Sequence, residues 1–165
     1  MKRSLLYATT ALLLPIGIAQ AGGPPQGKEG LWSLSRQTID NPGGKKEVWP
    51  PMTVCLSHAY NEHVLELAKK TPGCTTVSES TEGNKYFTES RCVVGNTVID
   101  TKATTTLQGD TYTHGEGHTT YTPAMGGKTE TIMISDAKYL GSCPAGMQPG
   151  DRKTADGTIQ HGWKH

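Results

Sequence analysis

Several features that identify common classes of protein are missing from this sequence. After Ile18 there is no further long apolar segment, so the rest of the chain offers no membrane span of roughly 20 residues. Basic residues occur in pairs and never in a long run, which argues against a nucleic-acid-binding surface. The GxSxG motif of hydrolases and a glycine-rich phosphate loop between a strand and a helix are also missing. The chain therefore carries no recognisable catalytic motif, and we expect no cofactor.

The first 21 residues have the pattern of a cleavable signal peptide. Lys2 and Arg3 form a short positive region, an apolar stretch follows, and residues 19–21 (Ala-Gln-Ala) have the small-x-small pattern of a signal peptidase site. We expect cleavage between Ala21 and Gly22 and a soluble, periplasmic mature protein. Without the leader the chain has 14 basic and 15 acidic residues, a net charge of −1, which again does not favour nucleic acid as a partner.

The four cysteines follow no zinc-binding template, because no CxxC pair occurs. Exported proteins form disulfides by default, so we expect two bridges. We favour Cys55 with Cys74, around one predicted helix, and Cys92 with Cys143, which would tie the last strand to the middle of the sheet. The main alternative is Cys74 with Cys92, across a predicted hairpin, and Cys55 with Cys143. Because the hydrophobic content is only 34%, these bridges should contribute to folding.

The mature chain predicts a mainly β domain, at the margin of the α+β class. Turn signals separate runs of high β-propensity, which favours an antiparallel meander of about six or seven strands in a curled sheet or open barrel. Ser57 is a suitable N-cap and apolar residues then recur at helical spacing, so we expect one α-helix at residues 57–70, with its apolar face packed on the sheet. Residues 47–56 should form an irregular or edge strand, because Pro50-Pro51 cannot lie in a central one.

Two segments lack this pattern. Residues 22–29 are rich in glycine and proline, and we expect a flexible linker. Residues 145–165 consist mainly of turn-forming and charged residues, with Ile159 and Trp163 as their large apolar side chains, and we expect a disordered tail. The ordered part is then a single disulfide-stabilised β domain at residues 30–144, and we expect a monomer.

Two groups of residues are candidate sites. His114, Glu116 and His118 alternate onto one face of a predicted strand, but the two histidines would lie about 13 Å apart, too far to share a metal ion unless the chain bends. Gly115 and Gly117 between them indicate a bulge or close packing instead. The second group consists of large aromatics that could border a binding surface: Trp32, Trp49, Tyr112 and Tyr121. For Trp32 we favour packing in the core.

The landmarks of the chain occur in an order that resembles a known family. They are Gly30-Leu31-Trp32 at the start, Val54-Cys55-Leu56 before the helix, Cys74 and Cys92 around a hairpin, and Gly141-Ser142-Cys143-Pro144 at the end. Together they are similar to exported proteobacterial proteins that are catalogued only as a domain of unknown function. The resemblance implies export, a single domain and structural cysteines. It brings no activity, ligand or catalytic residue.

These observations favour a non-catalytic binding protein whose concave sheet face holds an apolar small molecule or a protein partner. Two alternatives stay open. A metal-handling protein would require His114, Glu116 and His118 to converge within coordination distance. An enzyme of unidentified class would require a pocket that holds titratable groups with altered pKa values.

Overall fold

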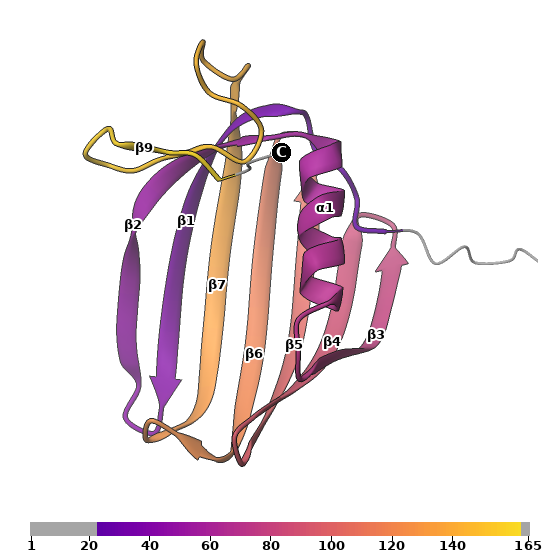
Figure 1. Ribbon diagram of the computed structural model, residues 1–165, viewed down its shortest axis with the longest axis vertical. Helices are drawn as coiled ribbons and strands as arrows, with labels where there is room; N and C mark the ends of the chain where they lie inside the picture. Colours follow the sequence, from indigo (N-terminus) through magenta and orange to yellow (C-terminus); the bar gives the residue numbers. More distant parts are fainter. Residues whose placement is uncertain (1–22, 163–165) are drawn as a thin grey trace, which may run out of the picture.

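The structure is a computed structural model that describes residues 23–162, and it consists of one curled antiparallel sheet with a single helix (Figure 1). The long strands are β1 (Gly30–Asn41), β2 (Lys45–Leu56), β3 (Cys74–Glu82), β4 (Lys85–Val94), β5 (Thr97–Gln108), β6 (Tyr112–Met125) and β7 (Lys128–Gly141). The helix α1 (His58–Lys69) lies between β2 and β3 in the sequence, and β8 (Arg152–Lys153) and β9 (Ile159–Gln160) are short. The predicted mainly β fold is confirmed; the predicted signal peptide lies outside the described residues.

The sheet has the order β3-β4-β5-β6-β7-β1-β2-β8-β9 and does not close. The strands β3 to β7 form the predicted meander, and β1 then pairs with β7, far from it in the sequence. Leu34 of β1 lies opposite both Met52 of β2 and Ala137 of β7, which in turn lies opposite Thr113 of β6. Directly opposed residues share a face. This row lies on the face that curves around α1, which we call the concave face (Figure 1).

A β-bulge accommodates the two prolines of β2. Leu34 and Arg36 of β1 pair with Met52 and Trp49 of β2, so one extra residue is inserted in β2 at Pro50 and Pro51. Proline cannot donate to a ladder, and β8 pairs with β2 only at Thr53 and Val54. The prolines therefore lie on an edge stretch of β2, as predicted.

The helix begins and ends where the sequence predicts but does not pack as expected. The Ser57 Oγ accepts a hydrogen bond from the Tyr60 N–H at 3.1 Å, which caps the first turn. No residue of α1 is buried, and Val64 and Leu67 are 43% and 54% exposed. The expectation that the apolar face packs on the sheet is thus wrong, because polar contacts near the two ends hold α1. His58 bonds to the Gly27 carbonyl at 2.8 Å, and Lys69 bonds to Glu79 of β3 at 3.2 Å.

Within residues 23–162, α1 is the one helix, and it is too short and too polar to cross a membrane.

The segment predicted as a flexible linker is held in place over its described part. The Lys28 N–H donates to the Asp110 carbonyl at 2.8 Å, and the Thr81 Oγ donates to the Gly23 carbonyl at 3.1 Å. Residues 23–29 therefore run from β3, past α1, to the start of β1 (Figure 1). The prediction failed because main-chain groups make these contacts, and a Gly/Pro-rich composition does not reveal them.

The expected disordered tail is also a correction, for residues 145–162. The Gly150 N–H donates to the Cys55 carbonyl at 2.7 Å, and the Cys55 N–H donates to the Asp151 carbonyl at 3.0 Å. Asp151 is only 2% exposed, and its carboxylate accepts from the Gln148 N–H. The segment thus completes the hydrogen bonding at the end of β2 and supplies β8. Its low apolar content concealed this role.

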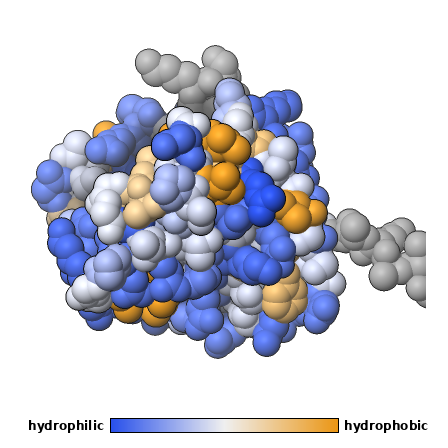
Figure 2. All heavy atoms as spheres, turned by 90° about the horizontal axis from the view of Figure 1, so that it is seen from below, coloured by the Kyte–Doolittle hydropathy of each residue, from blue (hydrophilic) through white to orange (hydrophobic). Residues whose placement is uncertain are grey.

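The core is concentrated where β1 begins and β2 ends. Trp32, 3% exposed, lies opposite Val54 and packs edge-on against Tyr139, with ring centroids 5.8 Å apart. The Trp32 indole N–H donates to the Lys28 carbonyl at 2.8 Å. At the opposite end, which carries the β1–β2 and β6–β7 turns, the surface is mostly hydrophilic, with hydrophobic residues in small separate groups (Figure 2).

The two disulfides join Cys55 to Cys143 and Cys74 to Cys92, so the favoured pairing was wrong and the stated alternative is found. Cys74 and Cys92 lie directly opposite each other in the β3–β4 ladder, with 4.0 Å between their Cα atoms. Cys55 lies one strand away from the end of β7, because β1 runs between them. The error arose because the sequence does not reveal that β1 pairs with both β2 and β7.

Loss of the Cys55–Cys143 bridge should destabilise the protein more than loss of the Cys74–Cys92 bridge. The bridges span 88 and 18 residues, and in the chain-entropy model loops of these sizes contribute about 4.5 and about 3 kcal/mol. Urea unfolding of Cys55→Ala/Cys143→Ala and of Cys74→Ala/Cys92→Ala measures the difference. Equal losses, or a greater loss in the second variant, would contradict it. A non-reduced tryptic digest provides the control, since it should link peptide 47–69 to peptide 139–152.

Candidate functional site

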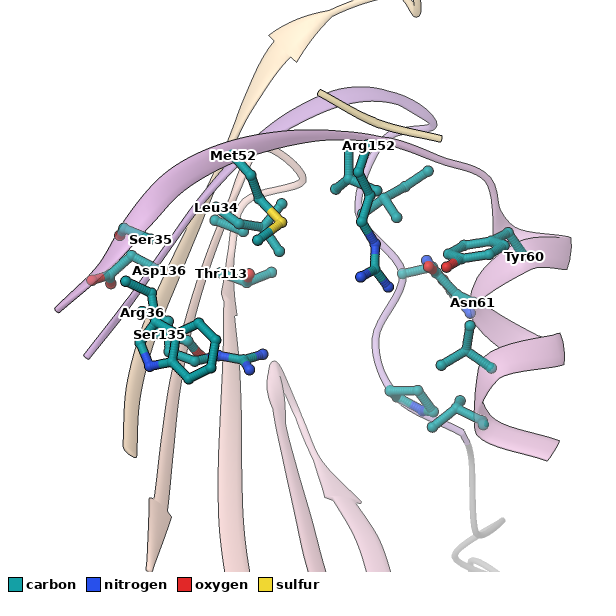
Figure 3. Close-up of a pocket in the computed structure, with 18 of the residues that line it drawn as sticks. Leu34, Ser35, Arg36, Met52, Tyr60, Asn61, Thr113, Ser135, Asp136 and Arg152 are labelled. Atoms are coloured by element: carbon teal, nitrogen blue, oxygen red, sulfur yellow. The ribbon is translucent and has the colours of Figure 1, made fainter. Parts of the chain in front are cut away.

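A cavity of about 650 Å³ lies between the concave face and α1 (Figure 3). Its walls come from α1, β1, β2, β6, β7, β8 and the segment before β1. Most of the lining is apolar: Pro24, Pro25, Leu34, Trp49, Pro50, Met52, Val54, Leu56, Val64, Leu65 and Ala137. Cavities of about 300–1,000 Å³ with such walls are typical of small-molecule sites. The space exists because α1 is held at its ends and does not press its apolar face onto the sheet.

The sheet side of the cavity is formed partly by small side chains, which leave space above the strands. Ala137 and Thr113 lie side by side on the concave face, and Ser135 and Gly115 form the next row. A Cβ atom on Gly115 would lie 2.6 Å from the Ser135 Oγ. The lack of a side chain at Gly115 therefore makes room for a side chain of β7. It does not serve to let the helix pack on the sheet. The bulge expected at Gly115 is absent from the β6–β7 ladder as far as Thr120.

The bulge in β2 builds one wall. A bulge turns two consecutive residues toward the same side of a sheet, and both Trp49 and Pro50 line the cavity. Trp49 is 44% exposed, although tryptophan is usually highly buried. Directly across the ladder from Trp49 lies Arg36, which also lines the cavity.

Two arginines bring positive charge to this apolar space. Arg36 extends from β1 and Arg152 from β8, and both guanidinium groups point into the cavity (Figure 3). Within residues 23–162, neither guanidinium has an ion pair or a side-chain hydrogen bond. Asp136 borders the cavity, but its carboxylate accepts hydrogen bonds from the Tyr112 hydroxyl and from His114, at 2.5 and 2.8 Å. It therefore does not neutralise the arginines.

Of the four aromatic residues proposed from the sequence, Trp49 lines this cavity. Trp32 packs in the core, as favoured, and borders a smaller cavity of about 100 Å³. Tyr112 is engaged with Asp136, and the Tyr121 hydroxyl donates to the Thr131 Oγ at 3.2 Å. Neither tyrosine lines the larger cavity.

Sequence reasoning missed most of the wall. Leu34 and Met52 could have been found from the two-residue period of their strands, because they share the face of Trp32 and Val54. Arg152 had no signal, since it lies in the segment expected to be disordered.

The histidine group lies on the opposite, convex face and does not converge. His114 Nδ1 lies 2.8 Å from Asp136 Oδ1 and its Nε2 lies 3.2 Å from Glu116 Oε1, while His118 contacts Glu130 of β7. Each histidine thus pairs with the carboxylate on the neighbouring strand. In the described part of the chain, no three His, Cys, Asp or Glu side chains are placed to hold a metal ion. The convergence that the metal alternative requires is not found in this geometry.

Hydrogen bonds explain the altered pKa values of His114 and Asp136. Hydrogen bonds to Asp136 and to Glu116 raise the pKa of His114. Hydrogen bonds from His114 and Tyr112 lower the pKa of Asp136. Both shifts are those of an ordinary ion pair, and they do not by themselves indicate a catalytic group.

Comparison with known proteins identifies the family. The model of a family described as "Protein of unknown function (DUF3617)" matches residues 27–143. This is more than half of the chain, so the chain belongs to this family. No curated protein matches it. The match contains Arg36 and Trp49 and ends before β8, so Arg152 lies outside it.

His114→Gln should destabilise the protein more at pH 5.5 than at pH 9. The pKa of His114 is raised above 6.5 in the folded state, so its contribution is complete below that pH and is lost as the pH rises through the raised value. The pKa of Asp136 is lowered from 3.8, so its contribution is lost only below that pH. At pH 5.5 the loss should reach at most about 1 kcal/mol, as for a partly exposed pair.

Urea unfolding of the wild type and of His114→Gln at the two pH values measures this difference. An NMR titration of the His114 ring provides an independent check of the raised pKa. An equal loss of stability at both pH values would show that the ion pair does not contribute in this way.

Proposed function

We propose that this member of the DUF3617 family is a periplasmic, non-catalytic binding protein that holds an apolar small molecule between α1 and the concave face. The observation that carries the proposal is the apolar cavity of about 650 Å³ that α1 leaves open. Trp49 and Val64 line it and are 44% and 43% exposed. Covering such apolar surface is favourable by about 25 cal/mol per Å².

The construction of the cavity favours a small molecule over a protein partner. Its walls surround the space from both the helix side and the sheet side, whereas a protein partner requires an accessible surface of about 800 Å² on each side. Most of its lining side chains carry no titratable group, which supports binding over catalysis.

Entry of a ligand is compatible with the way α1 is attached. The Lys69–Glu79 ion pair near its end is exposed on both sides, and such pairs contribute roughly 0–1 kcal/mol. The contact between His58 and the Gly27 carbonyl is also exposed. Small movements of α1 would therefore cost little, and the cavity could open without disturbing the ladder of the sheet.

Two independent features support export. Residues 1–21 have a signal-peptide pattern, and both cysteine pairs are placed to form disulfides, which persist outside the reducing cytosol.

The neutral fluorescent probe N-phenyl-1-naphthylamine tests the proposed cavity directly. The mature, oxidised protein should bind it saturably at one site. Ala137→Trp and Val64→Trp place an indole in the cavity from the sheet and from α1, and each should weaken binding at least tenfold. Val77→Trp is the matched control, because Val77 is 60% exposed on β3 and does not line the cavity.

Thermal unfolding of each variant without the probe ensures that weaker binding does not reflect loss of folding. The proposal fails if the wild type shows no saturable binding. It also fails if the two cavity variants, while folded, bind the probe as tightly as Val77→Trp does.

A further inference from the structure

We propose that the ligand of this cavity is a single-chain anionic amphiphile whose carboxylate head is held by Arg36 and Arg152. This inference rests on the proposed function and specifies the class of ligand. The observation behind it is the juxtaposition of two unpaired guanidinium groups with an apolar cavity (Figure 3).

Other basic residues of the sheet show that pairing is available in this fold. Arg91 bonds to Asp100 at 2.6 Å across the β4–β5 ladder, and Lys102 bonds to Glu89 at 3.0 Å. Lys128 bonds to Asp40 on the concave face at 2.6 Å. Arg36 and Arg152 have no such partner in residues 23–162; both residues are exposed, and their guanidinium groups point into the cavity (Figure 3).

The neighbouring acid is turned away from the arginines. Asp136 follows Ser135 on β7, opposite His114 on the convex face, and His114 and Tyr112 occupy its carboxylate. The cavity therefore keeps a net positive charge, which an anion entering it would neutralise.

The chemistry of arginine indicates the type of anion. A guanidinium presents a planar fork of N–H donors that matches a carboxylate through two parallel hydrogen bonds. Arg36 comes from β1 and Arg152 from β8, so the two guanidinium groups enter the cavity from different walls (Figure 3). Thr113 adds a hydroxyl on the floor of the same cavity.

The rest of the wall accepts a hydrocarbon chain. Leu34, Met52, Val54 and Leu56 line the sheet side, and Val64 and Leu65 line the helix side. The volume of about 650 Å³ suits one chain and not the two chains of a phospholipid. A free fatty-acid-like molecule is therefore favoured over a lipid that remains in a membrane.

Displacement of N-phenyl-1-naphthylamine by decanoate and by 1-decanol tests the inference, because the two differ in the charged head. The wild type should bind decanoate at least tenfold more tightly than decanol. Arg36→Gln and Arg152→Gln should each weaken decanoate binding about tenfold and leave decanol binding unchanged. Lys153→Gln is the matched control: it removes one charge from the same strand at a residue that does not line the cavity, and it should change neither affinity.

Arg36→Lys is a control for misfolding. It keeps the positive charge but loses the planar set of N–H donors of the guanidinium group. Its affinity for decanoate should lie between those of the wild type and Arg36→Gln. Increased salt should weaken decanoate binding and leave decanol binding unchanged.

The outcomes separate the two proposals. Equal affinity for decanoate and decanol overturns the anionic ligand but leaves the cavity proposal intact, whereas a lack of probe binding overturns both. Displacement by acetate as effective as by decanoate would overturn the role of the chain. Arginine-dependent binding to phosphatidylglycerol vesicles without decanoate binding would show a membrane lipid as the source of the anion and overturn the free ligand.

Discussion

The continuous antiparallel ladder from β3 to β2 is the constraint on which the rest of this structure depends. In residues 23–162 few apolar side chains are buried: Trp32, Val54, Cys55, Tyr86, Leu107 and Met147. A core this small cannot position a nine-stranded sheet by packing alone. Main-chain hydrogen bonds hold neighbouring strands together, and the two disulfides fix the ladder near both of its edges, at β3–β4 and at β2. The ladder therefore holds the sheet together although few apolar side chains of the described residues are buried.

The end of β2 links this scaffold to the cavity. Cys55 is fully buried, bridges to Cys143, and exchanges hydrogen bonds with Gly150 and Asp151. The next residue, Arg152, is thereby placed opposite Val54 and at the rim of the cavity. The same contacts that complete the core thus position one of the two charges, so the C-terminal segment acts in stability and in the site together.

The sequence predicted the local parts of the fold well. Alternating apolar residues gave the long strands, glycine-containing turns gave their ends, and Ser57 gave the start of α1, because each of these signals acts over a few residues. The disulfide pairing could not be obtained in this way, since it depends on β1 pairing with β7 about a hundred residues later. The order in residues 23–29 and 145–162 was missed because main-chain contacts, not apolar side chains, hold them.

The candidate site was also predictable in its local features but not in the features that depend on strand pairing. Trp49 was predicted as a large aromatic residue that could border a binding surface, yet its orientation follows from a bulge that only the pairing with β1 reveals. His114 and His118 attracted attention as chemical groups, but their strand spacing and the carboxylates of β7 turn them into surface ion pairs. Arg36 was unremarkable in the sequence, since its meaning depends on which acids lie nearby.

The open cavity has a physical cost that a bound ligand would recover. An amphipathic helix normally gains its stability by burying its apolar face, but Val64 of α1, which lines the cavity, is 43% exposed. Filling that face by direct packing on the sheet would be the more stable solution for a protein without a ligand. A ligand that binds only the folded state stabilises it in proportion to the logarithm of its concentration over Kd. In the proposed site, the underpacked helix would supply the apolar part of the binding surface and the two unpaired arginines would supply the charged part.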